Sequence, residues 1–80
     1  MCTSIKLNSL EDVKKLYNVA LSYNGNMYIS IGSDTSMLNA HSLLGMASLV
    51  GKDGLKLVFP DHADPSKVLK TIKKLEAALN

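Results

Sequence analysis

Ser42 is the strongest candidate for a chemical role in this sequence, because its neighbours predict that it caps the start of a short helix. Residues 39 to 51 read Asn-Ala-His-Ser-Leu-Leu-Gly-Met-Ala-Ser-Leu-Val-Gly. Serine is a preferred helix N-cap, and Gly51 suits the left-handed residue that follows a helix, so we expect a helix of about two turns. A phosphate on Ser42 would add about −1.5 to −2 charge beside the free N–H groups of that helix. A purely structural cap is the alternative.

The helix expected after Ser42 is apolar on two sides. One side carries apolar residues at the spacing of a single helical face, which predicts that they are buried together: Leu43, Met46, Leu49 and Val50. Leu44 and Ala47 fall on another side. A short helix lying on one layer of structure hides one face, so we expect a small exposed apolar patch beside the Ser42 hydroxyl. That combination suits the docking of a partner protein.

Three further side chains are candidates for chemistry. His41 precedes Ser42, where it could pair with a phosphoserine or respond to pH, or simply be solvated. His62 has acidic neighbours but no second histidine or cysteine at ligand spacing, so we expect no metal site and no cofactor. A single cysteine, Cys2, cannot form an internal disulfide and is interpreted as an inert surface thiol.

Length and charge narrow the classes of function. The 80 residues suit one domain, spanning 1–80, with a modest core. The net charge of +2 comes entirely from lysine, since the sequence contains no arginine. Arginine dominates guanine and phosphate recognition, so we expect no direct nucleic-acid binding. No secretory pattern and no apolar run of about 20 residues is present, which predicts a cytoplasmic protein without a membrane contact.

Hydrophobic periodicity predicts the elements that position these side chains. Alternation of polar and apolar residues indicates four strands, at 3–8, 27–31, 36–40 and 55–59, with a turn at 32–35. Helical periodicity indicates two long helices, the first begun by an N-cap at Ser9 and the last by an N-cap at Asp64. Their apolar stripes comprise Val13, Leu16, Tyr17, Ala20 and Leu21 in the first and Val68, Leu69, Ile72, Leu75 and Leu79 in the last. With the Ser42 helix the order is β-α-β-β-α-β-α. This order predicts an α+β open-faced two-layer sandwich, a four-stranded antiparallel sheet with three helices on one face.

The run Ser-Leu-Leu-Gly-Met-Ala-Ser-Leu from Ser42 to Leu49 resembles the regulatory-serine helix of HPr, the histidine phosphocarrier of the bacterial sugar phosphotransferase system. The similarity extends more weakly from about Ile5 to Leu79 and keeps the order of elements of that family. It implies the HPr fold, with Ser42 at the position of the regulatory serine. It also implies that partners contact the apolar positions Leu43, Leu44 and Ala47, beside His41 at a position that is often basic.

The phosphocarrier motif of the family is absent. The family has Gly-Ile/Leu-His-Ala/Thr-Arg-Pro at the start of its first helix, and the matching residues here read Ser-Leu-Glu-Asp-Val-Lys from Ser9 to Lys14. Glu11 stands where the histidine should be, and Val13 stands where the arginine should be. Phosphocarrier chemistry needs a nucleophilic imidazole and a nearby cation. We therefore predict that this chain accepts no phosphoryl group at that site.

The resemblance favours a non-enzymatic regulatory binding protein, similar to the HPr-like branch of catabolite repression. Its partners would be the HPr kinase/phosphorylase and a LacI-type transcriptional regulator, and the protein itself would be a monomer or a weak homodimer. Two alternatives stay open. The first is a phosphocarrier whose nucleophile has moved to His41, His62 or Cys2. The second is an interaction domain that keeps only the HPr fold, because a fold does not determine a function.

Overall fold

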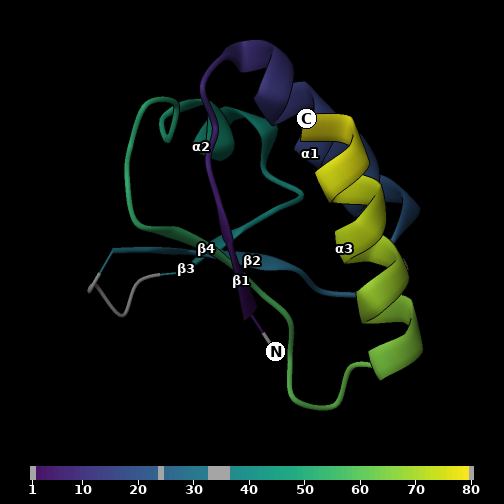
Figure 1. The fold of residues 1–80 in the computed structure, drawn as a ribbon. Coiled ribbons are helices and arrows are strands. Elements are labelled where there is room, and N and C mark those ends of the chain that lie inside the picture. The colour runs from purple at the N-terminus through teal and green to yellow at the C-terminus, as the bar shows by residue number, and fades with distance from the viewer. Residues whose placement is uncertain (1, 24, 33–36, 80) are drawn as a thin grey trace.

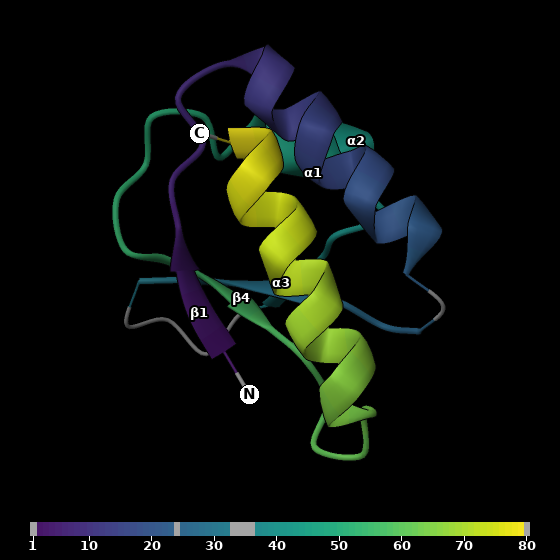
Figure 2. The ribbon, with the colours of Figure 1, turned by 45° about the vertical axis from the view of Figure 1, so that its right-hand side comes forward.

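The computed structural model describes residues 2–23, 25–32 and 37–79 and confirms the predicted α+β architecture. The described elements follow in the predicted order: β1 (Cys2–Ile5), α1 (Leu10–Ser22), β2 (Tyr28–Ile31), β3 (Met37–Asn39), α2 (Leu43–Ala47), β4 (Leu55–Val58) and α3 (Pro65–Leu79). The helices lie together on one side of the sheet, with α2 beside α1 and the long α3 crossing the other end (Figure 1, Figure 2).

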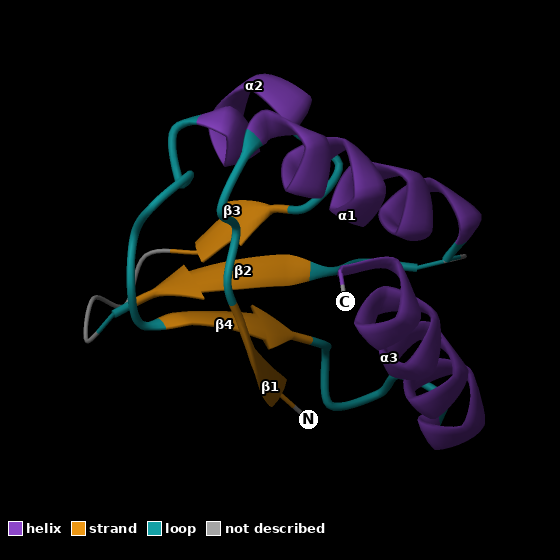
Figure 3. Cartoon of the chain, turned by 45° about the horizontal axis from the view of Figure 1, so that its top comes forward, coloured by secondary structure: helices purple, strands orange, loops and turns teal. Residues whose placement is uncertain are grey.

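The four strands form one antiparallel sheet in the order β1-β4-β2-β3. One row of paired residues crosses all four strands, from Thr3 through Leu57 and Ile29 to Leu38. Side chains alternate along a strand, so this row faces the helices while the neighbouring residues face away. Figure 3 shows the strands from the side on which the helices lie. The sheet is therefore open on one side, as the sequence predicts.

The core fills the space between the sheet and the helices. Its largest fully buried side chains come from every layer of the fold: Phe59, Leu7, Leu16, Met27, Ile29, Met46, Leu49, Leu55, Leu57, Val13 and Val68. Phe59 follows β4 and packs edge to face on Tyr23, with 5.4 Å between the ring centroids and 70° between the ring planes. This geometry is favourable for aromatic pairs. One aromatic contact thus joins the end of α1 to the end of β4.

Both long helices begin at the caps that the sequence predicts. The Ser9 hydroxyl accepts a hydrogen bond from the Asp12 backbone N–H at 3.3 Å, and the Asp12 carboxylate accepts one from the Asn8 N–H at 2.9 Å. This reciprocal arrangement is a variant of the capping box. At the start of α3 the Asp64 carboxylate accepts the Ser66 N–H at 3.0 Å.

Two predicted elements end more than one residue early, and the other described strand boundaries differ from the prediction by at most one residue. The first strand ends at Ile5 rather than Asn8, because Ile5 pairs with Leu55, the first residue of β4, and no strand among the described residues pairs with residues 6–8. The Ser42 helix has five residues rather than two turns. Gly51 has the expected positive φ of 82°, but its N–H donates to the Leu7 carbonyl at 2.8 Å. The helix gives way to i→i−3 turn hydrogen bonds after Ala47, and the Gly51 contact ties this turn to the segment before α1.

Three leucines expected in the core lie on the surface. Leu43, Leu21 and Leu69 are 38%, 57% and 52% exposed. Each leucine belongs to an apolar stripe that is wider than the surface its helix packs against. The leucine lies at the side of that stripe and is therefore solvated. Part of the predicted 32–35 turn and the first residue of the predicted 36–40 strand lie outside the described residues.

Lys6 and Asp53 form an ion pair that ties the end of β1 to the loop before β4. The hydrogen bond and charge of Lys6 lower the pKa of the Asp53 carboxyl below its ordinary value of 3.8. A carboxyl with a depressed folded-state pKa contributes stability above its unfolded-state pKa, and this contribution is lost as pH falls through the folded-state pKa. Because both side chains are solvated, the contribution is small and sensitive to salt.

We expect wild-type protein to lose slightly more stability than Asp53→Asn when the pH falls from about 6 to about 2. Urea unfolding midpoints followed by circular dichroism across this range measure the difference. Asp61→Asn serves as a control, since no ion pair of Asp61 occurs among the described residues. Parallel curves for wild type and Asp53→Asn would contradict the expectation.

Candidate functional site

Ser42 is the exposed N-cap of α2, as its position in the sequence predicts. Its hydroxyl oxygen accepts a long hydrogen bond from the Gly45 N–H at 3.4 Å, and its carbonyl accepts the Met46 N–H at 3.0 Å. Its own N–H donates to the Asn39 carbonyl at 3.0 Å. The backbone on both sides of Ser42 is therefore held in place, while its hydroxyl lies at the surface.

Ser42→Ala is expected to lower the free energy of unfolding by about 1 kcal/mol, because the Gly45 N–H loses its side-chain acceptor. Ser42→Asp should retain most of this stability, since aspartate caps helices as well as serine does. Equilibrium urea unfolding of the three proteins measures both values. An alanine variant as stable as wild type would show that the long Ser42–Gly45 hydrogen bond contributes nothing.

Gly45 lets α2 lie close to the sheet edge. A Cβ atom at this position would stand 2.9 Å from Leu38 Cδ1 on β3 and 2.9 Å from the Ser42 hydroxyl oxygen. Both contacts are closer than carbon and oxygen atoms tolerate without a shift. A side chain at this position would therefore displace the ends of the Leu38 and Ser42 side chains, and glycine avoids that shift.

Asn39 orients the imidazole of His41. The Asn39 side-chain oxygen accepts the His41 backbone N–H at 2.8 Å and lies 3.1 Å from the His41 Nδ1. An atom that accepts one N–H is the oxygen of the amide, so the ring nitrogen facing it must be a donor. This arrangement assigns the proton of the neutral ring to Nδ1. The Nε2 atom is left as the acceptor of the half-buried His41 ring.

Leu44 is exposed beside Ser42, as predicted, and Leu43, which was expected on the buried face, extends the apolar patch. Leu44 is 87% exposed and Leu43 is 38% exposed, whereas Ala47 is half-buried. Met46 is fully buried and anchors the short helix in the core. We call Ser42, Leu43, Leu44 and Ala47 the Ser42 surface. It places one hydroxyl beside an apolar side chain that has almost no contact with the rest of the molecule.

Glu11 lies exposed in the first turn of α1, four residues before Lys15. Its carboxylate is 4.0 Å from the Lys15 ammonium, a pair that stabilises a helix only slightly when solvated. Asp12 beside it belongs to the helix cap. The N-terminal turn of α1 thus carries two negative charges that complement the helix dipole.

The other candidate side chains are not brought together. Cys2 is exposed at the start of β1, and His62 is exposed in the turn before α3. Across residues 2–23, 25–32 and 37–79, no group of three or more metal-ligating side chains occurs. Within the same ranges, no helix is long and apolar enough to cross a bilayer.

A pocket of about 280 Å³ between β1 and α3 was not predicted from the sequence. Its lining comprises Thr3, Ser4, Ile5, Lys6 and Asn8 from the β1 segment and Ile72, Leu75, Glu76 and Leu79 from α3. The feature of the sequence that indicates this pocket is Glu76, a charged residue next to Leu75 within the apolar stripe of the last helix. The stripe predicts buried core positions, yet Ile72 and Leu79 are only half-buried.

Comparison of the chain with protein-family models, curated proteins and solved structures finds no match. The fold and the site are therefore interpreted from their own geometry, as an α+β domain that presents an exposed N-cap serine beside an apolar patch.

Proposed function

We propose that this chain is a regulatory binding protein of the HPr type, controlled by phosphorylation of Ser42. The observation that carries the proposal is the Ser42 surface, in which an exposed hydroxyl caps a short helix directly beside the 87% exposed Leu44. The sequence from Ser42 to Leu49 resembles the regulatory helix of HPr, and the order of elements is the one that this resemblance implies. Fold and local sequence thus support the same class of protein.

Phosphorylation at this position would change the surface without disturbing the fold. The hydroxyl already accepts the Gly45 N–H, so a phosphate there is compatible with the helix start and its positive dipole end. The new charge would stand beside Leu43 and Leu44, where a partner needs an apolar surface. Binding of a partner with a complementary cation is thereby strengthened, and binding of an apolar partner is weakened.

The first turn of α1 argues against a histidine phosphocarrier at the family site. Glu11 is a carboxylate rather than an imidazole, and the Asp12 carboxylate already accepts the Asn8 N–H. The Asp12 N–H is in turn bonded to the Ser9 hydroxyl. A dianionic phosphoryl group would meet two negative charges and find these donors occupied.

The proposal assigns the protein to the cytoplasm of a bacterium, with an HPr kinase/phosphorylase and a LacI-type regulator as partners. Intact-mass spectrometry after incubation with ATP and an HPr kinase tests it. We expect one phosphoryl addition on wild type and none on Ser42→Ala, with Ser48→Ala as the matched control that retains the addition. No addition to wild type, under conditions in which a true HPr is phosphorylated, would reject the proposal and favour a plain interaction domain.

A second candidate function is a phosphocarrier that uses His41. The Asn39 contact supports it, because a ring with its proton on Nδ1 offers the Nε2 lone pair as a nucleophile. Incubation with phosphoenolpyruvate and Enzyme I would then give an acid-labile phosphoryl addition that is absent from His41→Gln. An addition stable to acid, or none, would contradict this candidate and leave the regulatory proposal untouched.

A further inference from the structure

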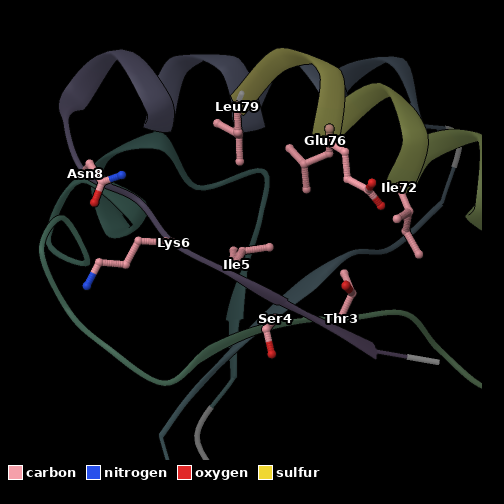
Figure 4. A pocket seen from close by; sticks show the side chains of 9 residues that line it. Thr3, Ser4, Ile5, Lys6, Asn8, Ile72, Glu76 and Leu79 are labelled. Atoms are coloured by element: carbon pink, nitrogen blue, oxygen red, sulfur yellow. The ribbon is translucent and has the colours of Figure 1, made fainter.

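The outer edge of β1 is a sheet edge without a partner strand among the described residues. β1 pairs with β4 on one side, and it is the terminal strand in the order β1-β4-β2-β3. An edge strand presents unpaired backbone N–H and C=O groups to whatever approaches it. Figure 4 shows the Ser4 side chain directed away from α3, so it is the Ser4 backbone that borders the pocket. The pocket therefore lies along an open backbone edge.

The walls of this pocket are apolar on both sides. Leu79 of α3 lies opposite Ile5 of β1 at one end of the pocket (Figure 4). Ile72 of α3 lies opposite Thr3 of β1 at the other end. Ile5, Ile72 and Leu79 are each half-buried and pack against the core. Covering such partly solvated aliphatic groups is favourable, at about 25 cal/mol per Å² of apolar area.

The pocket lining holds one cation, Lys6, and one carboxylate, Glu76. Glu76 is exposed on α3 and its carboxylate points toward β1 between the apolar residues (Figure 4). No ion pair of Glu76 occurs among the described residues, whereas the positive charge of Lys6 is taken up by Asp53. The pocket thus offers one carboxylate that lacks a cation partner, on a protein whose net charge is +2.

We propose that this β1–α3 groove binds an extended peptide segment of another protein, added as a further strand on the edge of β1. Backbone hydrogen bonds to β1 supply affinity, and the side chains that face α3 supply specificity. Those side chains alternate, so the positions i and i+2 of the peptide both face the groove. One of these peptide positions takes an aliphatic side chain, which contacts Ile5, Ile72 and Leu79 of the groove. The other takes a lysine or arginine, which pairs with Glu76.

Two other occupants fit the groove less well. Its volume of about 280 Å³ is close to the lower limit of about 300 Å³ for small-molecule sites, and the open backbone edge of β1 beside it favours a peptide instead. A second copy of this chain, paired through β1 about a two-fold axis, would place two Glu76 carboxylates at one interface, where like charges repel. Its Lys6 could not neutralise them, because Lys6 is already paired with Asp53. None of the lining residues belongs to the Ser42 surface, so the inference does not depend on phosphorylation.

Phage display of a random dodecapeptide library on the immobilised full chain tests the proposal. We expect enrichment of the pattern aliphatic-x-Lys/Arg. A fluorescein-labelled consensus peptide should bind wild type at least about tenfold more tightly than Glu76→Lys, because the hydrogen-bonded charge pair is lost. Asp61→Lys makes the same change of charge at an exposed turn residue outside the groove and should bind as wild type does. Glu76→Gln, which keeps the shape of the side chain, should bind with reduced dependence on salt.

Amide chemical shifts locate the peptide. Changes confined to residues 2–8 and 72–79 are the expected result. Enriched peptides without a basic residue, equal affinity for wild type and Glu76→Lys, or shifts centred on residues 43–47 would overturn the proposal. Failure to enrich any sequence would overturn it as well. Concentration-dependent shifts at residues 2–5 in the free protein would identify a second copy as the occupant and also reject it.

Discussion

Replacing Phe59 by alanine is expected to lower the free energy of unfolding by about 3–5 kcal/mol. The ring is only 2% exposed and is the largest fully buried side chain of the core. Its removal leaves a cavity beneath Tyr23 and also loses their edge-to-face contact. A domain of this size is stable by about 4–12 kcal/mol in total. The variant should therefore lose a large fraction of the total stability of the domain.

Urea unfolding followed by circular dichroism measures this effect. Phe59→Leu should keep more than half of the stability that Phe59→Ala loses, because leucine fills most of the volume of the phenylalanine ring. Leu44→Ala removes a large apolar side chain that is 87% exposed, and it should change stability by less than about 0.5 kcal/mol. A Phe59→Ala protein with a wild-type midpoint would mean that the core around β4 is not packed as the structure shows.

The second large effect concerns binding rather than stability. Under the proposed function, Leu44→Asp is expected to lower the kcat/KM of Ser42 phosphorylation by HPr kinase about 30-fold, the loss typical of an apolar anchor at the centre of an interface. The reason is position, since Leu44 is the most exposed large apolar residue described and lies two residues from the hydroxyl. A partner that reaches Ser42 must cover this side chain.

Leu69→Asp is the matched control for this experiment. Leu69 is a 52% exposed leucine on α3, and it belongs neither to the Ser42 surface nor to the β1–α3 groove. Its replacement should leave the phosphorylation rate within about twofold of wild type. Thermal melting of both variants separates a defect in recognition from a defect in folding. Equal rates for Leu44→Asp and Leu69→Asp would show that the kinase does not use the apolar patch.

Local sequence determined the elements and their starts. Ser9, Ser42 and Asp64 cap their helices as predicted because each cap bonds to a backbone N–H within three residues of it. The alternation that places Leu55, Leu57 and Phe59 in the core also needs only neighbouring residues to be seen. From these elements the two-layer architecture follows, since an amphipathic helix and a half-buried strand must cover one another.

Tertiary structure decided which apolar residues are solvated and where surfaces meet. Leu21, Leu43 and Leu69 share helical faces with buried residues, and only the width of the opposing surface shows that they are exposed. The Lys6–Asp53 pair joins residues 47 positions apart. The Gly45 approach to Leu38 and the groove between β1 and α3 likewise join separate elements. Periodicity assigns each side chain to a face of its own element, but burial depends on the shape and extent of the element opposite.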